Sequence, residues 1–130
     1  MIDDFVEWER ENHQTIETVH GFLCQNLSSE PEELIDQLCE IEAWGARIGE
    51  LQANADSWLD RAKMTLRPSK DFGSELDRRT ELDGIVAPLR MVRDKLESLA
   101  YCIKQRLILG ESLLAYHRQF QDHKMKEKIF

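Results

Sequence analysis

The chain has few of the residues that interrupt helices or build specialised sites. Its 130 residues include only six glycines and three prolines, so long helices meet few interruptions. The three cysteines, Cys24, Cys39 and Cys102, are an odd number without a Cys-x-x-Cys pair; this pattern predicts no disulfide framework and favours a reducing compartment. No apolar run approaches the roughly 18 residues of a membrane-spanning helix, and the first residues are acidic where a signal peptide is basic. We therefore expect a soluble, cytoplasmic, helical protein.

Motifs for catalysis or cofactor binding are also missing. The sequence contains no glycine-rich phosphate loop, no HExxH, no Gly-x-Ser-x-Gly and no EF-hand spacing. The best metal candidate is Glu17 with His20, near His13 and Cys24, but a di-metal site in a helix bundle needs two Glu-x-x-His pairs and two further glutamates. One such pair is present. We expect no enzyme activity, no catalytic residue, no cofactor and no metal.

The sequence does contain a long stripe of apolar residues with helical spacing. Steps of mostly three and four residues place these side chains on one side of an α-helix. Roughly 33 residues of helix reach on the order of 50 Å, beyond the width of a small compact domain, so another element has to lie alongside. The stripe consists of Leu82, Ile85, Leu89, Val92, Leu96, Leu99, Ile103, Leu107, Gly110 and Leu114.

Two further helices are predicted before this stripe. The first spans about 3–27, although Glu9 and Asn12 place polar side chains in its apolar stripe. The second spans about 30–66. A Ser-x-x-Glu capping box and a proline in the first turn mark its start, and a proline two residues beyond residue 66 ends it.

The third helix is harder to delimit, because Gly84 and Pro88 both disfavour a helix interior. The expected boundaries are a turn over 67–74, a distorted or separately packed segment over 75–87, unbroken helix over about 88–122, and a frayed tail over 123–130.

Together these elements predict one all-α domain over residues 1–130. Its centre is a long antiparallel, coiled-coil-like helical hairpin with an additional N-terminal helix laid across or along it. A hairpin of two long helices with one shorter helix is too slender to cover all of its apolar residues. Those that lie beside the main stripes form an exposed patch, which predicts an interface, most simply in a homodimer. The candidate interface residues are Trp44, Trp58, Met91, Ile108, Leu113 and Tyr116.

The net charge of −8 is unevenly distributed. Residues 1–60 carry 15 acidic residues against Arg10 and Arg47, a balance of −13, whereas residues 61–130 have a balance of +5. We expect the acidic half to lie against the basic helix, with the remaining acids in solvent. Two alternatives stay open: the acids imitate DNA phosphates and occupy a host DNA-binding or defence protein, or the basic helix binds nucleic acid. The candidate basic face, with aromatic residues interleaved, consists of Arg90, Arg93, Lys104, Arg106, Arg118, Lys124, Lys126 and Lys128.

Parts of the chain resemble small all-helical proteins encoded by bacteriophages and prophages. The resemblance lies in the segment Ala55–Lys63 and in the stretch from Arg93 to Leu114. Those proteins are themselves uncharacterised, so the resemblance implies a phage origin and action inside a bacterial host cell, and it assigns no functional residue. The sequence as a whole favours a non-catalytic protein-interaction or assembly module that self-associates, with a host or phage protein as a further partner and no membrane association.

Overall fold

The computed structural model describes the backbone of residues 2–65 and 75–129 and, within these ranges, the side chains of 3–64, 80 and 82–124. This part of the chain consists of three helices, α1 (Ile2–Leu23), α2 (Pro31–Thr65) and α3 (Glu75–Ile129), and contains no strand. The predicted all-α class is therefore confirmed. The expected turn at 67–74 and the expected end of the second helix at 66 lie outside the described residues.

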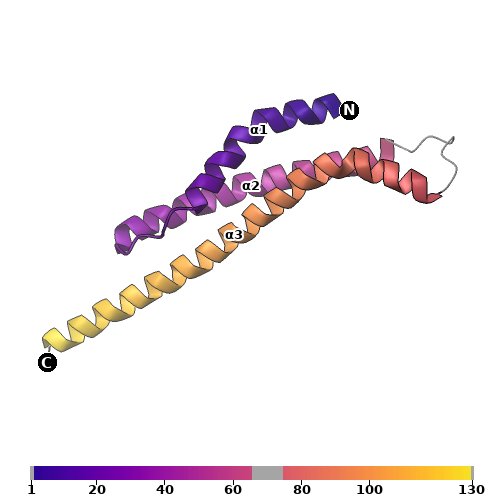
Figure 1. Cartoon of the computed structure of the whole chain (residues 1–130). Coiled ribbons are helices and arrows are strands. Elements are labelled where there is room, and N and C mark those ends of the chain that lie inside the picture. The colour runs from indigo at the N-terminus through magenta and orange to yellow at the C-terminus, as the bar shows by residue number, and fades with distance from the viewer. Residues whose placement is uncertain (1, 66–74, 130) are drawn as a thin grey trace.

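α2 and α3 lie side by side and pack extensively against each other, while α1 lies against this pair (Figure 1). Their inner faces are the apolar stripes that the spacing predicts, and burying each large apolar side chain contributes about 1.5–3 kcal/mol. The larger of two buried clusters joins all three helices through Ile16, Val19, Leu23, Leu34, Leu38, Ile41, Ile48, Leu51, Ala55, Leu96, Leu99 and Ile103. The smaller cluster consists of Phe5, Leu59, Ala62, Val86 and Leu89.

α3 is continuous through residues 75–87, where the sequence predicted a distorted or separately packed segment. Pro88 lies inside the helix and removes one backbone donor, and α3 bends in its N-terminal part (Figure 1). Val86 and Leu89 are buried on either side of the proline, so packing against α2 holds a segment that local propensity disfavours. At its other end the helix reaches Ile129, beyond the expected end at 122.

Two glycines let α2 and α3 approach closely. A Cβ atom added to Gly45 would lie 3.1 Å from Cγ2 of Ile103, and one added to Gly110 would overlap the Leu38 side chain. Each glycine therefore faces a specific residue of the opposite helix, and a larger side chain would push the helices apart.

The polar stripe member Asn12 is buried, at 8% exposure, and its hydrogen bonds are satisfied. Its Nδ2 donates to the carbonyl of Trp8 at 2.8 Å, and its Oδ1 accepts a hydrogen bond from Arg47 at 3.1 Å. Arg47 also forms an ion pair with Glu50 at 3.2 Å. If α1 shifted along α2, Asn12 and Arg47 would separate and leave a buried polar group without a partner, which costs free energy. This contact therefore favours one position of α1 along α2.

Candidate interaction surface

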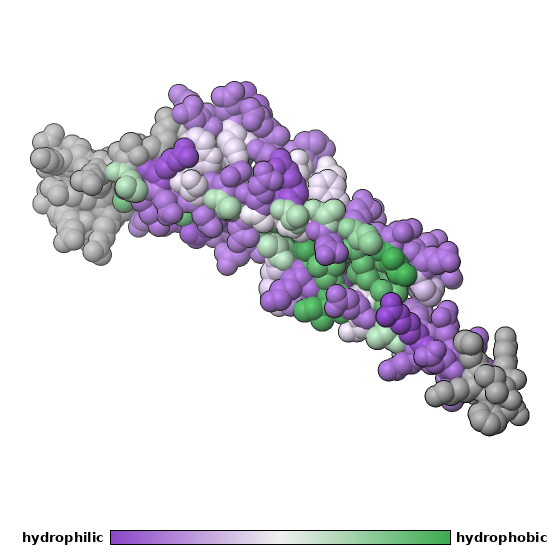
Figure 2. Space-filling model, turned by 180° about the vertical axis from the view of Figure 1, so that it is seen from behind, coloured by the Kyte–Doolittle hydropathy of each residue, from purple (hydrophilic) through white to green (hydrophobic). Residues whose placement is uncertain are grey.

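The outward side of α3 carries a row of large apolar side chains that no other helix covers. Successive members are seven, one, seven and four residues apart, so all of them fall on one side of the helix. They are 63, 50, 51, 63 and 48% exposed in chain order. Figure 2 shows hydrophobic residues gathered over the part of the molecule that leads to the C-terminal end. We call Tyr101, Ile108, Leu109, Tyr116 and Phe120 the outer row.

A groove lies at the start of the outer row, and two of its aromatic rings stack near its end. A groove of about 230 Å³ lies at its start, lined by Tyr101, Cys102, Gln105, Arg106 and Leu109. Near its end the rings of Tyr116 and Phe120 stack with centroids 6.5 Å apart, and the Lys124 ammonium lies 4.8 Å from the centre of the Phe120 ring. Single exposed apolar residues are common on proteins, whereas several large ones on one side of a helix make this face the candidate interaction surface.

The structure divides the six predicted interface residues into two groups. Met91, Ile108 and Tyr116 are exposed, at 73, 50 and 63%. Trp44, Trp58 and Leu113 are half-buried and pack against the protein's own two clusters. The large aromatic residues thus belong mostly to the core.

Trp58 illustrates this core role. Its ring meets the edge of Phe5 from α1 with centroids 6.3 Å apart, and the Arg61 guanidinium lies 5.3 Å from the Trp58 ring centre. The indole therefore helps to hold α1 on α2.

Sequence reasoning did not place Tyr101, Leu109 or Phe120 in the interface. Tyr101 and Phe120 were noticed only as aromatic residues between basic ones. Leu109 was missed because Leu107, Ile108 and Leu109 are consecutive apolar residues. Consecutive residues point in different directions around a helix, so the run does not show which of them is exposed.

The signal that would have found the outer row is a spacing of seven residues, from Tyr101 to Ile108 and from Leu109 to Tyr116.

The structure does not assemble the predicted basic face into one free surface. Arg90 pairs with Asp83 and Arg93 with Asp94, each at 3.0 Å. Lys104 and Arg118 are exposed. The side chains of Lys126 and Lys128 lie outside the described residues.

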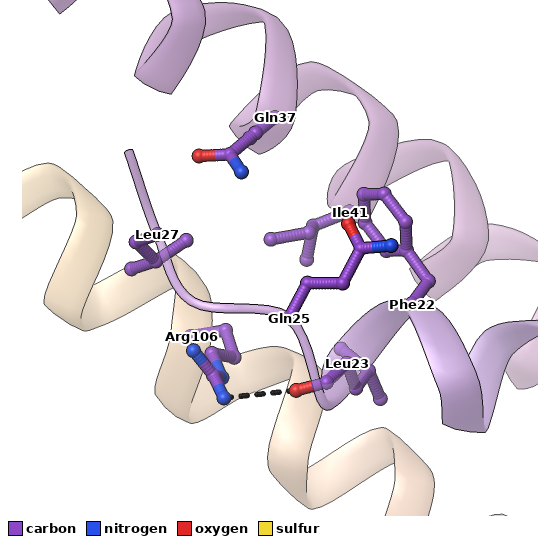
Figure 3. Close-up of a pocket in the computed structure, with 7 residues that line it drawn as sticks. All are labelled: Phe22, Leu23, Gln25, Leu27, Gln37, Ile41 and Arg106. Atoms are coloured by element: carbon purple, nitrogen blue, oxygen red, sulfur yellow. Dashed lines mark hydrogen bonds between the residues drawn. The ribbon is translucent and has the colours of Figure 1, made fainter. Parts of the chain in front are cut away.

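Arg106, another predicted member of the basic face, is used inside the fold. Its guanidinium donates a hydrogen bond to the Leu23 carbonyl at 2.8 Å, at the end of α1 (Figure 3). This contact satisfies a carbonyl that the helix itself leaves unpaired. It lies beside a cavity of about 10 Å³ lined by Phe22, Leu23, Gln25, Leu27, Gln37, Ile41 and Arg106, which is about the room that one water needs. Arg106 is therefore a structural residue that caps α1 at Leu23, where the helix ends before the expected 27.

The acidic half of the chain is largely in solvent. Every Asp and Glu among residues 1–60 is exposed except Glu9, which is half-buried. An ion pair between described residues joins this half to α3: Lys95 Nζ donates to Glu17 Oε1 at 2.6 Å. The imitation of DNA phosphates by these acids stays a prediction.

The Glu17–Lys95 contact makes a pH prediction. The hydrogen bond from Lys95, and then its charge, lower the pKa of Glu17 below the ordinary glutamate value. A lowered pKa in the folded state stabilises the protein above the unfolded value of about 4.3 and loses that contribution as pH falls through the folded pKa. Glu17→Gln should therefore melt slightly below the parent protein at about pH 7, and the difference should shrink as the pH falls below about 4.3. A difference that stays constant as the pH falls would mean that the pair is not formed.

The described residues contain neither a group of metal-ligand side chains nor a helix that could span a membrane. No group of three or more His, Cys, Asp and Glu side chains gathers among them to hold a metal ion. The three cysteines are exposed thiols. Of the helices in this part of the chain, none is long and apolar enough to cross a bilayer.

Comparison with known proteins adds no relative. No protein-family model, no curated protein and no solved structure matches the chain. The resemblance to small phage proteins therefore stays a prediction.

Proposed function

We propose that the protein is a non-catalytic interaction module that self-associates through the outer row of α3. The observation that carries this proposal is the exposure of five large apolar side chains on one side of a helix whose other side is already packed. Removing such a surface from water is favourable at roughly 25 cal/mol per Å² of apolar area. A second protein surface is the occupant that such an extended row fits, since an extended helix face offers no enclosed volume for a small ligand.

The scaffold that presents the row is, in this proposal, an antiparallel coiled-coil-like hairpin of α2 and α3. Gly45 faces Ile103 and Leu38 faces Gly110. A step of seven residues back along α2 thus matches a step of seven residues forward along α3, as two oppositely directed helices in a heptad register require. Such a scaffold is rigid over its paired length, so the outer row keeps its spacing when a partner binds.

The site of action in this proposal is the cytoplasm of a bacterial host, with a phage as the source. The resemblance of the segments around residues 55–63 and 93–114 supports the origin, and exposed free thiols support a reducing compartment.

Self-association through the outer row predicts a concentration-dependent dimer that one substitution weakens. Leu109→Lys places a charge in the middle of the row and should shift the protein toward monomer by at least about tenfold in dissociation constant, since burying an unpaired charge is costly. Size exclusion with light scattering over micromolar concentrations measures this.

Val6→Lys is the matched control for that experiment. Val6 is 43% exposed on α1, close to the 51% of Leu109, and receives the same new side chain away from the row. It should leave the dimer unchanged. A parent protein with a mass of 15.2 kDa at every concentration would refute self-association.

A further inference from the structure

We propose that the partner on the outer row is a second copy of this chain, packed antiparallel with α3 against α3 and held in register by ion pairs along one edge of the row. This inference rests on the proposed self-association and adds its direction, its register and the residues that set them.

The evidence is a row of alternating charges on α3. Residues of opposite sign follow one another at intervals of seven: Asp83, Arg90, Glu97, Lys104, Glu111 and Arg118. Seven residues are nearly two turns, so these side chains form a line along one side of the helix. We call this line the charged row.

The charged row borders the outer row. Lys104 is three residues after Tyr101 and four before Ile108, which places it next to both on the helix surface. Lys95 and Arg106, two α3 residues that donate hydrogen bonds to α1, lie along the other edge of the outer row. The charged row therefore faces away from α1 and is open to a partner.

Within the chain, the first two members of the charged row satisfy each other, because Arg90 and Asp83 are 3.0 Å apart. The other four members are Glu97, Lys104, Glu111 and Arg118, of which the first three lie three or four residues from Tyr101 or Ile108 and so border the outer row. All four are exposed, and none forms a hydrogen bond or ion pair with another of the described residues. A seven-residue interval is about 10 Å along the helix, which is too long for most of them to pair with one another.

An antiparallel second copy matches two of these charges. In an antiparallel pair of helices the residues on the same edge face each other. With the two-fold axis midway between Gln105 and Gly110 in sequence, Lys104 faces Glu111 of the partner subunit, and both residues border Ile108 of the outer row. The symmetry repeats each contact, because every subunit offers the same surface.

The alternation also excludes the neighbouring registers. Sliding one copy by seven residues in either direction places Glu opposite Glu and a basic residue opposite a basic residue. Like charges directly opposed across an interface are unfavourable, so the row disfavours the two neighbouring registers. In the proposed register the axis lies within the stretch that the outer row spans, from Tyr101 to Phe120, so the apolar contacts fall on both sides of it.

A charge exchange tests this arrangement with the full-length protein. Lys104→Glu alone and Glu111→Lys alone each place like charges opposite each other twice per dimer, and each should weaken the dimer roughly tenfold. The double variant Lys104→Glu with Glu111→Lys restores two opposite pairs and should dimerise like the parent. Sedimentation velocity at low salt measures the three dissociation constants.

Glu111→Lys is the most discriminating of the three, because it reduces the negative charge of the whole protein and would strengthen association if only net charge mattered. Weakening by Glu111→Lys with recovery in the double variant is the result expected. If Leu109→Lys dissociates the dimer but the exchanges change nothing, the proposed function stands and the antiparallel register is wrong. A parent protein that is monomeric throughout overturns both.

Discussion

Leu99→Ala should lower the free energy of unfolding by about 2–5 kcal/mol, the range found for leucines removed from well-packed cores. Leu99 is 4% exposed and belongs to the larger cluster, where side chains from all three helices meet. Because rigid helices on both sides prevent collapse around the missing atoms, most of the cavity would remain. Chemical denaturation followed by circular dichroism measures the loss.

Asn54→Ala is the control for this core truncation. Asn54 is exposed on α2 and lies next to buried Ala55, and a surface change of this kind stays within about 0.5 kcal/mol. Equal denaturation midpoints for Leu99→Ala and Asn54→Ala would show that the inner face of α3 has been assigned wrongly. The comparison is best made at one protein concentration, since any dimer adds its own contribution to stability.

Much of the helical core follows from spacing alone. Leu89, Leu96, Leu99 and Ile103 are all buried at 4% exposure or less, as steps of three, four and seven residues predict. Periodicity succeeds here because it depends only on the geometry of one helix. It does not show contacts between residues far apart in sequence: Arg47 of α2 donates a hydrogen bond to buried Asn12, and α1 ends where Arg106 of α3 meets the Leu23 carbonyl.

The outer row could be predicted only in part, for a physical reason. The C-terminal half of α3 has apolar residues on its inner and outer sides, and a sequence pattern does not show which side another helix covers. Ile108 and Tyr116 were predicted as interface residues together with Trp44 and Trp58, because all four lie beside the main stripes, but the two tryptophans are half-buried. Large aromatic rings bury much area wherever they lie, so size alone does not separate core from interface.

The charge pattern shows a similar limit. Grouping Lys104 and Arg118 with all other basic residues hid their alternation with Glu97 and Glu111, which is visible only when residues are compared at intervals of seven. Arg90, Arg93 and Arg106 then proved to have partners within the fold. A count of basic residues therefore overestimates the charge that remains for a nucleic-acid partner.

Gly110→Ala and Gly49→Ala should change stability in opposite directions, although both replace a mid-helix glycine by the same residue. A Cβ added at Gly49 meets nothing within 4 Å, so Gly49→Ala should gain up to about 1 kcal/mol from helix propensity. At Gly110 the new methyl group would overlap the Leu38 side chain. Leu38 is itself only 8% exposed, so it has little room to move, and overpacking of this kind costs about 1–3 kcal/mol, as much as the propensity gain or more.

The sign of this difference tests how closely α2 and α3 approach. Thermal melts of the two variants beside the parent protein should place Gly49→Ala above it and Gly110→Ala below it. Leu38→Ala in the Gly110→Ala background removes the side chain that the new methyl group meets. The double variant should therefore lose less free energy of unfolding than the two single variants lose in sum. A double-mutant cycle measures this difference. Stabilisation by Gly110→Ala alone would mean that the helices are farther apart at this point, and the facing of Leu38 and Gly110 that supports the antiparallel hairpin would be wrong.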